Sequence, residues 1–206
     1  MTNDYVTALL IGLLTGVLSC FFAQGGIANY KLFNRLTKTK GKWHKYRLLI
    51  VLFHLMISIY GVYLYGIGQG FVEFMLTCSY LTAMTATDIR KRQIPDDATI
   101  FYGMIFIIIK LSAMDLYVVL NSVMGIVLGT LMPAVAYLIN KNSIGLGDIK
   151  LIACVSIPIG FPNIIYVLAK AFFVGGIYAA VMLLRKKVKR DTELPMVPFI
   201  LAGAIF

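Results

Sequence analysis

Charged side chains are scarce in this sequence, and acidic ones are the scarcest. Charged residues make up 14% of the 206 residues, with 9 Asp and Glu against 19 Lys and Arg. A soluble globular domain carries about 25% charged residues, whereas here the apolar set AVILMFWYC reaches 60%. This composition argues against a water-soluble domain, disorder, collagen and coiled coil, and it indicates a polytopic membrane protein.

Residues that bind metals are also few. Cys20, Cys78 and Cys154 lie far apart inside apolar runs and form no CxxC pair, while His44 and His54 are isolated. Such spacing favours neither a zinc site nor a disulfide framework, so we expect no metal and no cofactor, and we expect His54 to be a helix-packing residue. The net charge of +10 is typical of basic cytoplasmic loops, and we expect no nucleic-acid partner.

Apolar runs divide the chain. They predict an all-α fold with about eight transmembrane helices, in one membrane domain over residues 1–206 with no separate soluble domain. No basic residue precedes the first run, which therefore reads as a retained helix rather than a cleaved signal peptide. The last run spans about 20 Å as a helix, short of a hydrocarbon core of about 30 Å, and we expect it to be incomplete. The runs cover residues 6–29, 48–70, 71–87, 98–113, 116–140, 149–160, 162–184 and 194–206.

The distribution of Lys and Arg predicts an orientation. Nearly all of them fall in four of the connections, and the three remaining connections carry none. If the N-terminus is outside, all four basic connections lie in the cytoplasm, as expected for a multi-pass protein of the plasma or inner membrane surrounded by lipid. Lys110 and Lys170 lie inside apolar runs, where a charge is costly unless it is paired. The basic connections are residues 31–47, 88–97, 141–150 and 185–190.

Two aspartates stand at the predicted cytoplasmic ends of spans. Asp88 follows the third run and Asp148 precedes the sixth. Two facing carboxyls can hydrolyse a peptide bond, one taking a proton from water and the other giving one to the substrate. Because both cannot ionise cheaply, they would share a proton. Helix dipoles predict that Asp148, near a helix N-terminus, is the charged base, and that Asp88, near a C-terminus, is the proton donor.

Glycines surround the second aspartate and recur in the spans. Gly145 and Gly147 precede Asp148, and we expect them to allow a tight turn and close approach of a substrate strand. Gly125 and Gly129 are expected to permit close helix packing.

The two aspartate segments resemble the motifs of the type IV prepilin peptidases, which are GxGD membrane aspartyl proteases. Asp88 to Asp96 matches that family's D-x5-I-P-D/N segment, and Gly145 to Leu151 matches its GxGDxKL segment. Leu194 to Phe199 resembles the Pro-x-x-Pro-Phe sequence before the family's last helix. The likeness extends from about residue 70 to the C-terminus.

The resemblance implies an activity and a set of site residues. The expected function is removal of the short leader of type IV prepilins or pilin-like precursors at the cytoplasmic face. Asp88 and Asp148 would be catalytic, and the expected motif or substrate-binding residues are Gly145, Gly147, Lys150, Ile94, Pro95 and Asp96. Lys150 would stabilise ionised Asp148, hold a substrate backbone, or simply be a cytoplasmic lysine.

One departure from the family concerns the connection at residues 31–47. Many bacterial members carry two CxxC pairs after the first helix, associated with N-methylation of the new pilin terminus, whereas this connection has no cysteine. A zinc-bound domain is excluded there. The expected activity is therefore the peptidase, and methyltransferase activity is not implied.

Two other classes remain as alternatives. A presenilin or signal-peptide-peptidase type of protease also uses Gly-x-Gly-Asp, although those enzymes have Tyr-Asp where this chain has Thr87-Asp88. A proton-coupled transporter could use the two aspartates as a relay, but it would need acidic groups near the bilayer middle.

Overall fold

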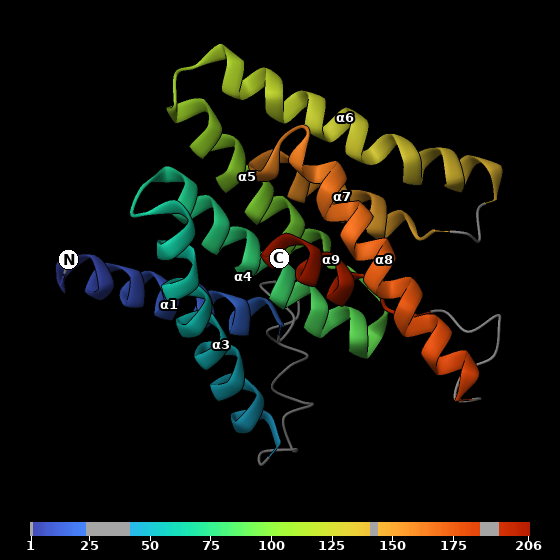
Figure 1. Cartoon of the computed structure of the whole chain (residues 1–206), viewed down its shortest axis with the longest axis horizontal. Coiled ribbons are helices and arrows are strands. Elements are labelled where there is room, and N and C mark those ends of the chain that lie inside the picture. The colour runs from blue at the N-terminus through green and yellow to red at the C-terminus, as the bar shows by residue number, and fades with distance from the viewer. Residues whose placement is uncertain (1, 24–41, 141–143, 186–193) are drawn as a thin grey trace.

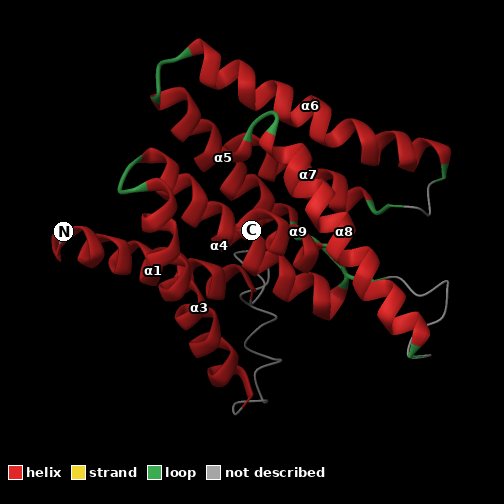
Figure 2. Ribbon diagram, in the orientation of Figure 1, coloured by secondary structure: helices red, strands yellow, loops and turns green. Residues whose placement is uncertain are grey.

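The computed structural model describes residues 2–23, 42–140, 144–185 and 194–206, and in these ranges it is built from helices alone (Figure 2). The predicted all-α class is therefore confirmed for the described residues. The helices are α1 (Thr2–Ala23), α3 (Lys42–Tyr65), α4 (Gln69–Lys91), α5 (Asp96–Ser112), α6 (Leu116–Ile139), α7 (Leu146–Ile159), α8 (Asn163–Leu184) and α9 (Val197–Ile205).

Each apolar run corresponds to one helix, but the expectation of eight membrane spans is confirmed only in part. Four helices, α1, α3, α6 and α8, are long and apolar enough to cross a membrane. Of the others, α5, α7 and α9 have 17, 14 and 9 residues, fewer than the roughly 20 that a span needs. The connection between the second and third runs lies at residues 66–68, because α3 ends at Tyr65 and α4 begins at Gln69. Residues 24–29 of the first run, and most of the basic connection at 31–47, lie outside the described residues.

The short helix α9 appears near the centre of the view in Figure 1 and contacts both α4 and α8. It approaches α8 closely through Gly203, because an added Cβ at this position would be 2.5 Å from the carbonyl oxygen of Val167. Elsewhere, α1 packs against α3 and α4, while α6 packs on α7. The long apolar helix α6 forms the upper edge of the view in Figure 1.

Two glycines expected to serve packing do so between α6 and α7. A Cβ at Gly125 would be 2.9 Å from the carbonyl carbon of Gly160, and a Cβ at Gly129 would be 2.8 Å from the Ser156 hydroxyl. Small residues therefore allow this close approach, as is common between helices in a membrane.

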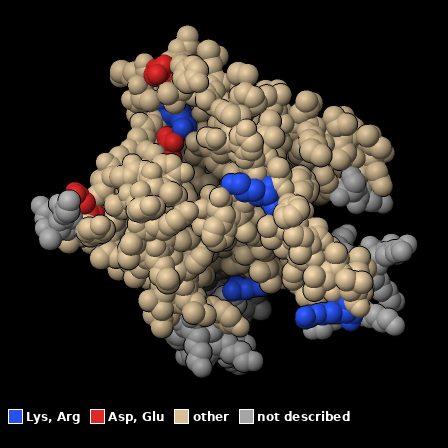
Figure 3. Space-filling model, in the orientation of Figure 1, with Lys and Arg blue, Asp and Glu red and all other residues tan. Residues whose placement is uncertain are grey.

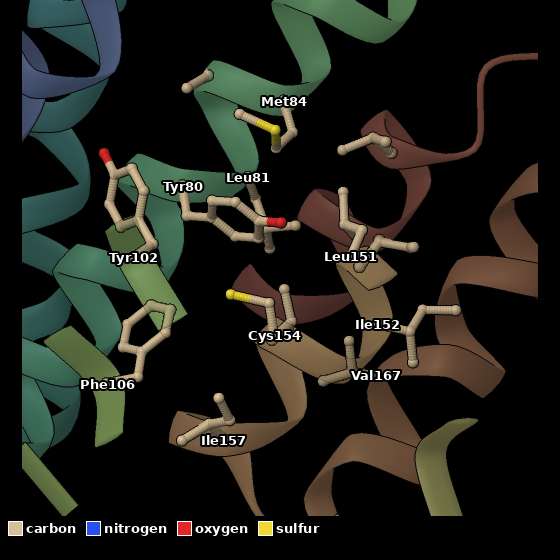
Figure 4. Close-up of a cluster of buried hydrophobic side chains, with 14 of the residues drawn as sticks. Tyr80, Leu81, Met84, Tyr102, Phe106, Leu151, Ile152, Cys154, Ile157 and Val167 are labelled. Atoms are coloured by element: carbon tan, nitrogen blue, oxygen red, sulfur yellow. The ribbon is translucent and has the colours of Figure 1, made fainter. Parts of the chain in front are cut away.

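The main hydrophobic core joins α4, α5, α7 and α8. Figure 4 shows Tyr80 and Met84 of α4 facing Leu151 and Cys154 of α7 across this cluster. Dispersion and burial of these side chains hold α4 against α7. This packing brings the end of α4, which carries Asp88, close to the start of α7, which carries Asp148.

A second buried feature is polar, and we call it the serine–histidine cluster: Ser19, His54, Ser79 and Tyr102, from α1, α3, α4 and α5. All four are fully buried. His54 Nδ1 donates to the Ile50 carbonyl at 2.9 Å, which leaves Nε2 to accept from the Ser19 hydroxyl at 3.1 Å. Ser79 Oγ lies 2.9 Å from Ser19 Oγ and 2.7 Å from the Tyr102 hydroxyl. The expectation that His54 serves helix packing is therefore confirmed.

The charged residues Glu73, Lys110 and Lys170 lie within the predicted apolar runs. Lys110, one of the two lysines in apolar runs, forms a 2.8 Å ion pair with Glu73, and both side chains are mostly buried. The other lysine, Lys170, lines a cavity of about 720 Å³ together with Glu73, Phe74 and Tyr166. Few charged side chains appear on the face in Figure 3, as expected for a surface in contact with lipid.

Candidate active site

Asp88 lies in the last turn of α4, just beyond the predicted span 71–87, and only 7% of its surface is exposed. Its Oδ2 accepts a hydrogen bond from the backbone N–H of Val197 at 3.2 Å. The helix ends at Arg92, which adopts a left-handed conformation with φ of 50° and donates its N–H to the Asp88 carbonyl at 2.9 Å. This turn redirects the chain so that Ile94 and Asp96 come back toward the site.

Asp148 lies in the first turn of α7, just before the predicted span 149–160, and is partly buried. Gly145 is the N-cap of this helix, and its backbone N–H donates to the Asp148 carboxyl. A side chain in the first turn that reaches back to the N-cap N–H is one half of a capping box. The local sequence therefore fixes the direction of the Asp148 carboxyl.

The two carboxyls are brought together from positions 60 residues apart in the sequence. Burial, and then the neighbouring Asp88 carboxylate, raise the pKa of Asp148 to about 6. Burial also raises the pKa of Asp88, but the N–H groups of Val197 and Met196 and the charge of Arg92 hold it down. These hydrogen bonds favour the charged form of Asp88 and so act against the order expected from the helix dipoles, in which Asp148 is charged and Asp88 holds the proton.

The remaining residues of the two motifs also meet. The Ile94 side chain packs on Gly147, where an added Cβ would be 3.5 Å from it. Lys150 forms a 2.9 Å ion pair with Asp96, both exposed. The structure thus pairs Lys150 with Asp96 rather than with Asp148. Pro95 is the N-cap of α5, and the Lys150–Asp96 ion pair shows that the first turn of α5 lies beside the start of α7.

The glycines before Asp148 do not need the conformational freedom that is special to glycine. Gly145 has φ of −72°, and Gly147 is not among the described residues with positive φ, so other residues could adopt these backbone angles. The chain does turn tightly at this point, because the Asp148 N–H donates to the Gly145 carbonyl at 3.0 Å. A Cβ at Gly145 would lie 3.5 Å from Asp148 Oδ2, at ordinary van der Waals distance.

Sequence reasoning missed the role of the segment before α9. Leu194 to Phe199 stood out as a Pro-x-x-Pro-Phe match, but nothing in it indicated that its backbone N–H groups bind Asp88. Every residue except proline has a backbone N–H, so the sequence does not show which of these groups bind a carboxylate. The Pro-x-x-Pro pattern was the signal in the sequence that singled out this segment.

The described residues form a helical protein in which four helices are long and apolar enough to cross a membrane, and two neighbouring aspartates lie at the ends of two other helices. Residues 75–180 match the type IV leader peptidase family. This chain belongs to that family.

Two curated relatives show the extent of the likeness. A prepilin leader peptidase/N-methyltransferase of Xanthomonas campestris pv. campestris is 27% identical over 157 residues, which are 74% of this chain and 54% of that protein. A protein of the same name from Bacillus subtilis is 30% identical over 146 residues, which are 68% of this chain and 56% of that protein. The chain spans about half the length of the curated relatives that it matches. No solved structure matches it.

Proposed function

We propose that this protein is a membrane aspartyl endopeptidase that removes the leader of type IV prepilins or pilin-like precursors on the cytoplasmic side of the membrane. The observation that carries this proposal is the pair Asp88 and Asp148, close enough for one charge to raise the pKa of the other carboxyl. Membership of the type IV leader peptidase family supports the substrate class.

The pair supplies each proton transfer that hydrolysis needs. Charged Asp88 takes a proton from a water molecule, whose oxygen then attacks the scissile carbonyl carbon. Asp148 gives its proton to the carbonyl oxygen, forming a gem-diol. As the C–N bond breaks, Asp88 passes its proton to the leaving amine and Asp148 recovers a proton from the diol. The pair ends in the protonation state in which it began.

The position of the pair suits a substrate that is itself a membrane helix. Both aspartates stand at helix ends that the basic connections assign to the cytoplasm. An apolar helix of the precursor would lie in the bilayer against the enzyme, and its leader would remain in the cytoplasm. The scissile bond has to be extended, because a peptide bond within a helix is shielded from attack.

Cleavage of a co-expressed prepilin tests the proposal. Asp88→Asn and Asp148→Asn should each lower leader removal by about 10²–10⁴-fold, since each removes a general acid–base group. Asp97→Asn is the matched control, because Asp97 is a nearby carboxylate that accepts from the Ala98 N–H rather than belonging to the pair. The reporter is the mass of the pilin, with membrane insertion of each variant checked by blotting.

The same experiment separates the alternatives. Cleavage that survives in both aspartate variants would eliminate the aspartyl peptidase proposal, and absence of cleavage by the unmodified protein would favour a transporter. Cleavage inside the apolar helix of the precursor, rather than at the end of its leader, would favour an intramembrane protease of the presenilin type. Mass spectrometry of the mature N-terminus decides separately whether the protein also methylates it.

A further inference from the structure

The start of α9 contributes backbone donors to the aspartate pair. The Val197 N–H lies 3.2 Å from Asp88 Oδ2, and the Met196 N–H also favours the charged carboxylate. Val197 is fully buried. The first N–H groups of any helix lack a partner within the helix, and in α9 the internal bonds begin with the N–H groups of Phe199 and Ile200, which both donate to the Met196 carbonyl.

The position of the negative charge cannot come from α4 and α7 themselves. Asp88 is close to the C-terminus of α4, where the dipole disfavours a negative charge, and Asp148 is close to the N-terminus of α7, where the dipole favours one. These two dipoles alone would place the charge on Asp148. The N-terminus of α9 is the element that acts in the opposite direction on Asp88.

We propose that Met196 and Val197 are positioning residues, whose backbone N–H groups keep the negative charge of the pair on Asp88 and so leave the shared proton on Asp148. This inference rests on the proposed peptidase function, because it assigns which aspartate is the base and which the acid. It makes α9 a third element of the active site, alongside α4 and α7.

Other charged groups near Asp88 contribute less to its charged state than the two N–H groups. Among the described residues, Arg92 at the C-cap of the same helix also lowers the pKa of Asp88, but less than either N–H group, and the Asp88 charge in turn raises the pKa of Asp148. Lys150 is held by Asp96, on the α5 side of the site. The residues of α9 itself carry no charged side chain, so its effect comes from the backbone.

The contact depends on how α9 is seated. Gly203 lets α9 approach α8 at the Val167 carbonyl, and Gly175 of α8 makes room for the Phe199 ring, which would lie 3.1 Å from a Cβ there. Both glycines thus fix the place of α9 without touching Asp88.

Removing one N–H without changing a side chain tests the proposal. The Val197 amide can be replaced by an ester by incorporating α-hydroxyisovaleric acid in the full chain during cell-free synthesis with nanodiscs. An ester at Ile200 is the matched control, because the Ile200 N–H donates within the helix at 3.3 Å to the Met196 carbonyl and not to Asp88. The readout is the pH dependence of kcat/KM for a prepilin peptide.

The Val197 ester should move the acidic limb of the pH profile upward by about one unit, because a carboxylate that loses a donor ionises less readily. The Ile200 ester should leave this limb where it is in the unmodified protein. An ester at Met196, made with the α-hydroxy acid of methionine, should move the limb in the same direction and replaces the Val197 ester if that one fails to insert.

Acidic limbs that coincide in the unmodified protein and in the Val197 and Met196 esters would overturn the proposal. That failure is distinct from failure of the proposed function, which would show as cleavage that survives both Asp88→Asn and Asp148→Asn. An equal shift in the Ile200 ester would also overturn it, because the effect would then come from a weakened helix.

Discussion

Helix α4 carries two buried polar clusters nine residues apart, and they differ in how far their hydrogen bonds are satisfied. In the serine–histidine cluster, each side chain has a partner at 2.7–3.1 Å and none carries a charge that the neighbours leave uncompensated. In the aspartate pair, two carboxyls compete for one proton, and burial raises the pKa of both.

The two clusters on α4 therefore have different expected roles, one in stability and the other in catalysis. A satisfied buried network ties helices together, and its loss leaves unpaired groups. A pair of buried carboxyls is costly to hold together, and the cost is tolerable where catalysis needs a perturbed pKa. Substitutions in the first cluster should therefore change folding, and substitutions in the second should change cleavage.

The largest effect on stability is expected at Ser79. Ser79→Ala removes the partner of the Tyr102 hydroxyl and should lower the free energy of unfolding by about 1–3 kcal/mol, with cleavage per folded molecule nearly unchanged. Thermal unfolding in detergent can be followed with a thiol-reactive dye, because Cys20, Cys78 and Cys154 are all buried.

Ser112→Ala is the control for that substitution, since Ser112 is exposed and bonds only to the nearby Ile109 carbonyl. Its effect should stay within about 0.5 kcal/mol. Equal stability of the Ser79→Ala and unmodified proteins would mean that the cluster does not hold the helices together.

A smaller effect is expected from pH. The pKa of Asp148 is about 6 in the folded protein against an ordinary value of 3.8, so proton binding stabilises the folded state fully below pH 3.8 and ceases to do so as pH rises through 6. Stability should therefore fall between about pH 4 and pH 7, by on the order of 1 kcal/mol once solvent screening of this partly exposed group is allowed for.

The variant Asp148→Asn sharpens this test. It should show a weaker fall over the same pH range and should be more stable than the unmodified protein at pH 7.5, although it no longer cleaves. An identical pH dependence of the unfolding temperature in both proteins would show that Asp148 is not the group that titrates near pH 6.

The smallest effect is expected at Lys150. Its ion pair with Asp96 is exposed, and such pairs contribute little, so Lys150→Ala should cost less than about 1 kcal/mol of stability and change cleavage less than about threefold. The pH profile of cleavage should keep its basic limb. A shift of that limb would indicate that Lys150 acts on Asp148 after all.

Much of the helical layout could be predicted from the sequence, because each apolar run needs to satisfy its own backbone hydrogen bonds in the membrane. The eight runs each became one helix, with ends displaced by a few residues. Lys110 was predicted to need a partner, but Glu73, 37 residues earlier, could be found only from the structure. Hydropathy therefore predicts where the helices lie in the sequence, but it does not predict which helices pack against one another.

The site was predicted in part for a similar reason. Asp88 and Asp148 were identified from their motifs, since a carboxyl at the edge of an apolar run is rare. Which of them holds the proton depends on N–H groups of Val197 and Met196, supplied by a helix more than 100 residues after Asp88 in the chain. The dipoles of α4 and α7 alone favour the opposite order, and the N–H groups of α9 could not be found from the sequence near either aspartate.

The position of Val197 also affects where the chain can be truncated without loss of the proposed active site. The matched stretch, residues 75–180, contains both aspartates but stops before α9. A truncation designed on that boundary would keep every acidic group of the centre and discard the two amides that decide its charge. The proposed functional unit therefore extends further toward the C-terminus than the matched stretch 75–180.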